Sequence, residues 1–166
     1  MSCVTVERLY ELYSIDLVEG KLTHRRSVGR AKAGQEIGYK SRAGYRIAHV
    51  DRQDYFVHNL VWFLAHGTWP PAGLEVDHKN RVRDDNRLGN LRLGTRSQNN
   101  ANHKIRCDNR TGVRGVSFSS ERGKYFVQVT VLGKKMSLGR YHSLEEARAV
   151  AKKAQQEAFG EFLAET

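Results

Sequence analysis

The fold is decided by the stretch LEVDHKNRVRDDNRLGNLRLGTRSQNNANHK, which spans residues 74–104. A short predicted strand, Leu74–His78, ends in an acid and a histidine side by side, and a long polar loop follows it. Leu91-Arg92-Leu93 alternates in polarity and should pair back on the first strand. Thr95 and Gln98 match a capping box, which predicts a helix from about residue 96 to residue 103. The stretch therefore predicts strand, loop, strand and helix.

Four polar side chains in this stretch suit the chemistry of phosphodiester cleavage. Asp77 and His78 are adjacent. Asn90 follows twelve residues after the histidine, and Asn99 stands near the predicted helix start. Cleavage needs a base that activates water and a cation that stabilises the leaving oxygen. Carboxylate and amide oxygens suit a hard ion such as Mg²⁺, and a neutral histidine can act as the base. The alternative is an Asp-His pair that merely ends a strand, since neighbouring strand side chains point to opposite faces.

The charge balance indicates a polyanionic partner. The chain has 166 residues, enough for one domain or two small ones. Its 28 Lys and Arg residues exceed its 18 Asp and Glu residues, which gives a net charge of +10. Such a balance suits nucleic acid, and a solvated basic surface without a partner is the alternative reading.

The cysteines and the apolar runs indicate a soluble cytoplasmic protein. Cys3 and Cys107 belong to no zinc-binding pattern, and two lone thiols are typical of a reducing compartment. The longest apolar run, Leu60–Ala65, is far too short to cross a bilayer. We therefore expect no membrane partner.

The rest of the chain predicts an α+β protein of two modules. Residues 1–104 form the first, with a helix near its start and a buried helix around residues 59–66. Residues 105–111 are polar, basic and without periodicity, which predicts a linker. Residues 112–162 predict three strands followed by a helix that begins after Ser143, with Ser143 and Glu146 as its capping box. This arrangement should be a three-stranded antiparallel sheet packed on one helix.

The second module offers a candidate surface for nucleic acid. One helix can cover only one face of a sheet, and the other face would present basic and amide side chains to a major groove. A solvated polar face is the alternative. The candidate DNA-binding side chains lie on or beside the predicted sheet: Arg114, Arg122, Lys124, Gln128, Lys134 and Arg140.

Two resemblances connect these patterns. The first is to the HNH homing-endonuclease family common in bacteriophages, and it rests on Val57–Trp62, Val76-Asp77-His78, Asp85-Asn86-Arg87, Asn90-Leu91-Arg92 and Gln98–Asn102. The second is to the ethylene-response-factor-like (APETALA-type) DNA-binding domain, and it rests on Gly112–Val116, Leu138–Tyr141, Glu145–Ala147 and Phe159-Gly160. The chain departs from these families at Asn59, where arginine is usual, and at Tyr125, where tryptophan is usual.

The resemblances imply a fold, a site and an activity. Residues from about 74 to 104 would form a ββα-metal (His-Me finger) motif. Asp77 and Asn99 would bind the metal, most simply Mg²⁺ with Mn²⁺ as a substitute. His78 and Asn90 would be the catalytic residues, with His78 as the general base and Asn90 holding the loop and orienting His78. The protein would be a metal-dependent DNA endonuclease of the phage homing type, acting on double-stranded DNA in the cytoplasm of a bacterial host, with no small-molecule cofactor.

Two other functions stay open at this point. The chain could be a non-catalytic DNA-binding regulator that uses the HNH fold as a scaffold, or an RNA-processing nuclease. The complete set of Asp77, His78, Asn90 and Asn99 argues against the regulator. His58 is expected to be a structural or capping residue, and Asn86 a turn former. The target sequence, the choice between nicking and double-strand cutting, and the oligomeric state are not fixed by these patterns.

Overall fold

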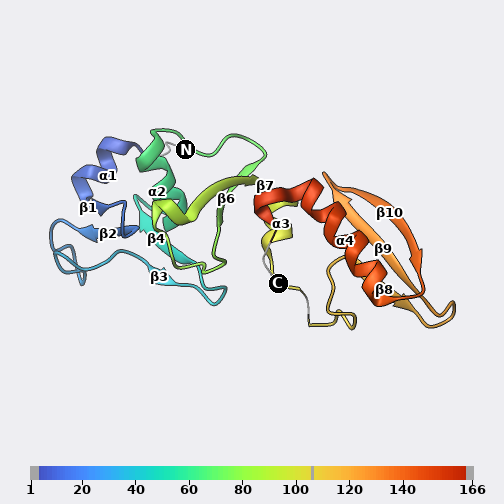
Figure 1. The fold of residues 1–166 in the computed structure, drawn as a ribbon. Helices are drawn as coiled ribbons and strands as arrows, with labels where there is room; N and C mark the ends of the chain where they lie inside the picture. The colour runs from blue at the N-terminus through green and yellow to red at the C-terminus, as the bar shows by residue number, and fades with distance from the viewer. Residues whose placement is uncertain (1–3, 106, 164–166) are drawn as a thin grey trace. The chain divides into compact units, whose positions relative to one another are not determined.

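The structure is a computed structural model that describes residues 4–105 and 107–163 (Figure 1). It is a mixture of helix and sheet, as the sequence predicted, and it divides into two compact units. The first unit runs to Gly94 and the second begins at Thr95. None of the helices among the described residues is long and apolar enough to cross a membrane.

The first unit begins with a short helix and two small antiparallel sheets. Helix α1 (Val6–Leu12) is capped by the hydroxyl of Thr5 and leads into the hairpin of β1 (Tyr13–Asp16) and β2 (Lys21–His24). A second sheet has the order β3 (Tyr39–Lys40), β4 (Arg46–Val50) and β5 (Gln53–Phe56). Helix α2 (Val57–His66) follows β5 directly and ends at Gly67, whose φ of +70° closes the helix in the left-handed conformation.

Strands β6 (Leu74–His78) and β7 (Leu91–Thr95) form a two-stranded sheet, with a short 3-10 turn, η1 (Leu88–Asn90), before β7. Val76 and Leu91 join these strands to the core built around α2, where Leu60 and Val61 are fully buried. Each such side chain contributes about 1.5–3 kcal/mol by leaving water. The strand that carries His78 is therefore packed on a rigid core.

The loop between β6 and β7 is tied to the rest of the first unit. Arg46 on β4 donates from Nε to Oδ1 of Asp84 at 3.0 Å. Arg83 donates from Nη1 to the carbonyl of Ala43 at 2.7 Å, and its guanidinium lies 5.0 Å from the ring centroid of Tyr45. These contacts hold a long polar loop in one conformation although it has few apolar residues.

The second unit contains α3 (Arg96–Asn102), β8 (Val116–Ser119), β9 (Lys124–Val131), β10 (Lys134–Tyr141), α4 (Leu144–Phe159) and the turn η2 (Gly160–Phe162). Thr95 and Gln98 form the capping box at the start of α3. The three strands are antiparallel in the order β10-β9-β8. Helix α4 covers one face of this sheet, with Ala147 and Ala151 packed against Val116 and Val127.

The second unit starts upstream of the predicted linker, because α3 packs within this unit. Ala101 is buried with Phe159 and Phe162. Part of the predicted linker is also hydrogen-bonded to the start of the sheet. Asn109 donates from Nδ2 to the carbonyl of Val113 at 2.9 Å. A polar composition was consistent with a linker, but here the polar groups serve a compact turn.

Candidate active site

His78 is held as a buried, neutral imidazole. It is the last residue of β6 and is 4% exposed. Its Nε2 lies 3.1 Å from Oδ1 of Asn86. An amide oxygen can only accept, so Nε2 carries the proton and Nδ1 keeps its lone pair. Burial lowers the pKa of His78, and the hydrogen bond with Asn86 and the charge of Asp77 only partly oppose this effect. The ring is therefore uncharged at neutral pH and able to accept a proton.

Aromatic rings surround His78 on the side of α2 and the β3–β5 sheet. The ring of His58 meets His78 edge-on with centroids 4.9 Å apart, and the ring of Tyr45 lies 6.0 Å away. Phe56 stacks on His58 at 5.2 Å. Burial lowers the pKa of His58 to about 3, so this neighbour adds no positive charge. That state agrees with the structural role expected for His58.

Asp77 is paired with an arginine of the adjacent strand. Nε and Nη2 of Arg92, on β7, each lie 3.1 Å from Oδ2 of Asp77. The side chain of Asp77 is only 12% exposed, and that of Arg92 is 11% exposed. A carboxylate next to the histidine is therefore kept in place by a charged partner that the sequence patterns did not identify.

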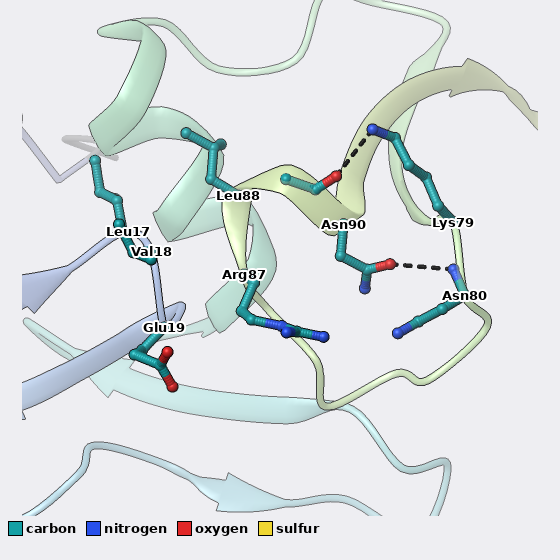
Figure 2. Close-up of a pocket in the computed structure, with 9 residues that line it drawn as sticks. Leu17, Val18, Glu19, Lys79, Asn80, Arg87, Leu88 and Asn90 are labelled. Carbon is teal, nitrogen blue, oxygen red and sulfur yellow. Dashed lines mark hydrogen bonds between the residues drawn. The ribbon is translucent and has the colours of Figure 1, made fainter.

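Asn90 holds both ends of the loop between β6 and β7. Its Oδ1 accepts from the backbone N–H of Asn80 at 3.1 Å (Figure 2). Its Nδ2 donates to the carbonyl of Asp85 at 2.7 Å, and its own carbonyl accepts from the N–H of Lys79 at 2.9 Å. Nε2 of His78 donates to Oδ1 of Asn86, whereas the side chain of Asn90 bonds to the backbone of Asn80 and Asp85. Asn90 therefore holds the loop segment that contains Asn86.

An open pocket lies beside Asn90, between the loop that follows β6 and the turn between β1 and β2. It is lined by Leu17–Glu19, by Lys79 and Asn80, and by Arg87–Asn90 (Figure 2). Neither Asp77 nor His78 lines it.

Asn99 lies on α3, in the second unit, where its side chain is buried. The other expected site residues, Asp77, His78 and Asn90, lie in the first unit. Within the described residues, no three His, Cys, Asp or Glu side chains are grouped as a metal site. The expected donors are one carboxylate and one amide, which suit in kind a hard divalent ion that retains several waters.

Three of the expected DNA-binding residues lie on the open face of the sheet, and two others lie in a turn and at the start of a strand. Val127 and Val129 on β9 are buried with the helix side of the sheet, so Lys124 and Gln128 point to the opposite, open face. Arg140 pairs with Phe126 in the register, which puts it on the same open face. Arg122 lies in the turn before β9, and Lys134 begins β10.

Arg114 lies just before β8, outside the strands of the sheet. It donates from Nη1 to the carbonyl of Asn100 at 3.1 Å and from Nη2 to the carbonyl of His103. The C-terminal end of a helix leaves carbonyl groups without partners, and an arginine is a natural donor to them. In this structure the guanidinium of Arg114 therefore braces the end of α3 within the second unit.

Comparisons with known proteins cover the region of the loop and the two strands. Residues 55–101 match the family model of HNH endonucleases. The chain is 33% identical over 105 residues to Protein 3.8 of Escherichia phage T7, a match that covers 63% of this chain and 85% of that protein. No solved structure matches the chain. The family match contains Asp77, His78, Asn86, Asn90 and Asn99.

Proposed function

The chain belongs to the family of bacteriophage T7 Protein 3.8 and carries an HNH endonuclease domain, and from this premise we propose that it is a metal-dependent endonuclease that hydrolyses double-stranded DNA. The observation that carries the proposal is the imidazole of His78, which is buried at the end of β6, hydrogen-bonded to Asn86 and next in the chain to Asp77. A phage homing nuclease, active in the cytoplasm of the host, is the role that suits this combination.

In the proposed reaction His78 is the general base. Nδ1 takes a proton from a water molecule, and the hydroxide forms a new bond to phosphorus while the bond from phosphorus to the 3′ oxygen breaks. The 3′ oxygen leaves and takes up a proton from solvent, so the products carry 5′-phosphate and 3′-hydroxyl ends. A general base typically contributes about 10²–10⁴-fold to such a rate.

Asp77 and Asn99 are the proposed ligands of a divalent cation, Mg²⁺ or Mn²⁺. Their oxygen atoms suit such an ion, which when bound stabilises negative charge on the phosphate and the leaving oxygen. Arg92 holds the carboxylate of Asp77 through two hydrogen bonds between the neighbouring strands β7 and β6.

The second unit serves in this proposal as a DNA-binding module like the ethylene-response-factor domain. Lys124, Gln128 and Arg140 lie on the face of the sheet that α4 leaves open. Contacts of the two cations with phosphates would supply affinity that falls with salt, and Gln128 could contact a base edge. A sheet face of this kind can enter a major groove.

A plasmid assay tests the proposal against a non-catalytic regulator. Supercoiled DNA is incubated with the full chain and Mg²⁺, and we expect nicked or linear products that the His78→Ala variant does not form. Binding without cleavage under all these conditions would favour the regulator. Single-stranded RNA offered in parallel separates a DNA endonuclease from an RNA-processing nuclease, and the cleavage ends are mapped by sequencing.

A further inference from the structure

We infer that Asn86 is the residue that positions His78, and that Asn90 acts on His78 through Asn86. The inference rests on the proposed function for its catalytic meaning, because it concerns the base of that reaction. It starts from a contact that the residue patterns did not identify: Oδ1 of Asn86 lies 3.1 Å from Nε2 of His78 across eight residues of sequence.

Asn86 does not have the surroundings of an ordinary turn former. Loop asparagines usually bond to the backbone two residues along and stay in water. Asn86 is only 3% exposed, and its amide oxygen faces an imidazole that is also buried. A polar group that is buried this deeply needs its hydrogen bond, because an unpaired one costs stability. The Asn86–His78 pair is therefore a fixed part of the loop.

The hydrogen bond decides which nitrogen of His78 can act as the base. A neutral imidazole carries one proton, on either Nδ1 or Nε2, and accepts with the other nitrogen. By accepting from Nε2, Asn86 leaves the lone pair on Nδ1 and also fixes the rotation of the ring. This arrangement therefore keeps Nδ1 pointing in one constant direction.

The backbone at Asn86 is held from two sides. Nδ2 of Asn90 donates to the carbonyl of Asp85 at 2.7 Å, which belongs to the peptide bond that leads into Asn86. On the other side lies Gly20, with φ of +66°, where a Cβ atom would overlap the backbone of Asn86 and Arg87. The β1–β2 turn and Asn90 thus clamp the same segment, so a change at Asn90 reaches His78 by moving Asn86.

The first experiment reads the ring of His78 directly by NMR, using ¹⁵N-labelled full-length protein without metal or DNA. We expect the proton on Nε2, with a slowly exchanging Nε2–H signal. The signal should disappear in Asn86→Leu, which has a similar size but no acceptor, and persist in Asn86→Asp, which keeps one. Val82→Ala, at an exposed position of the same loop, is the control and should leave the signal unchanged. A wild-type protein with its neutral proton on Nδ1 would overturn the inference without any variant.

The second experiment compares single-turnover cleavage rates at saturating protein. Asn86→Leu should lower the rate about 10–100-fold, as for other residues that orient a reacting group, while DNA affinity stays unchanged. Asn86→Asp should keep most of the rate. Asn90→Ala should also be slow, and the double variant Asn86→Leu/Asn90→Ala no slower than the poorer single variant, because both act along one path.

The results distinguish a failure of the inference about Asn86 from a failure of the proposed nuclease function. If the wild-type chain cuts DNA and Asn86→Leu cuts equally well, or if the double variant loses the product of the two single effects, the inference is wrong and the nuclease remains. If the wild-type chain does not cut DNA, the proposed function is wrong, and the Nε2–H signal still decides whether Asn86 holds the ring.

Discussion

Arg92 donates to the carboxylate of Asp77 from two nitrogen atoms, Nε and Nη2, each 3.1 Å from the same oxygen, Oδ2. The two residues lie on neighbouring strands, β6 and β7, and both are largely removed from solvent. A charge at this depth depends on its partner, because removing one member of a buried pair leaves the other uncompensated. The pair therefore links the position of the acid next to His78 to the pairing of the two strands.

The first prediction concerns this ion pair. Arg92→Leu should lower the free energy of unfolding by about 3–5 kcal/mol, since it leaves the carboxylate of Asp77 without its partner. The double variant Asp77→Asn/Arg92→Leu should recover a large part of that loss. Urea unfolding in EDTA measures both. A double variant as unstable as the sum of its two single variants would contradict the coupling.

The second prediction concerns the base. His78→Ala should reduce cleavage by about 10²–10⁴-fold, the usual contribution of a general base, while the chain still folds and binds DNA, with a lower free energy of unfolding because buried Asn86 loses its hydrogen bond. His66→Ala is the matched control, because His66 is an exposed histidine of the same unit, stacked on Trp62. Cleavage rates and circular dichroism check both variants. Normal cutting by His78→Ala would remove this residue from the mechanism.

The third prediction concerns the metal. EDTA should stop cleavage, and added Mg²⁺ or Mn²⁺ should restore it. Asp77→Ala should raise the Mg²⁺ concentration needed for half-maximal activity more than Asn99→Ala does, because the carboxylate supplies charge and the amide does not. Cleavage rates measured over a range of Mg²⁺ concentrations show which variant needs more metal. Full activity in excess EDTA would end the metal hypothesis.

The fourth prediction is a pH dependence of stability that comes from His58. Burial lowers the pKa of His58 from 6.5 to about 3 in the folded chain. Between those values the unfolded chain binds a proton that the folded chain does not, so stability falls as the pH drops from about 6.5 toward 3. The slope for one group is at most about 1.4 kcal/mol per pH unit.

His58→Phe keeps a ring against Phe56 and removes the titrating group. Urea unfolding of both proteins between pH 6 and pH 4, which lies inside that window, should give a shallower slope for the variant. His78, whose ring contacts His58, also has a lowered pKa, so His58→Phe should reduce the slope without abolishing it. Equal slopes would mean that His58 is not buried in its neutral form.

Local signals predicted the elements around the site, and long-range contacts supplied what sequence reasoning missed. The capping box of Thr95 and Gln98 predicted the start of α3, because a cap involves only neighbouring residues. The contact of Asn86 with His78 depends on the conformation of the loop between β6 and β7. The polar and apolar pattern of the sequence does not predict such a contact. Its one signal was the segment Asp85-Asn86-Arg87 in the family resemblance.

The Asp77–Arg92 pair was missed for a related reason. Arg92 stands between Leu91 and Leu93, so its alternation predicted a strand without saying what the side chain would meet on β6. At the start of α4, Ser143 accepts from the N–H of Glu145. The sequence had suggested a box with Glu146, and the choice between adjacent glutamates depends on the local turn.

The last prediction concerns the open face of the β8–β10 sheet. Lys124→Ala and Arg140→Ala should each weaken binding to duplex DNA and reduce the log–log slope of affinity against salt by about 0.9, if each cation neutralises one phosphate. Gln128→Ala should leave that slope unchanged, because a neutral amide releases no counterion.

Lys152→Ala on α4 is the control. It removes the same charge from an exposed position of the helix that covers the other face of the sheet. Arg114→Ala should instead lower the stability of the second unit, since its guanidinium is held by the carbonyls of Asn100 and His103. Binding measured by fluorescence anisotropy at several salt concentrations separates the two effects. An equal loss from Lys152→Ala and Arg140→Ala would show that net charge, and not this face, attracts the DNA.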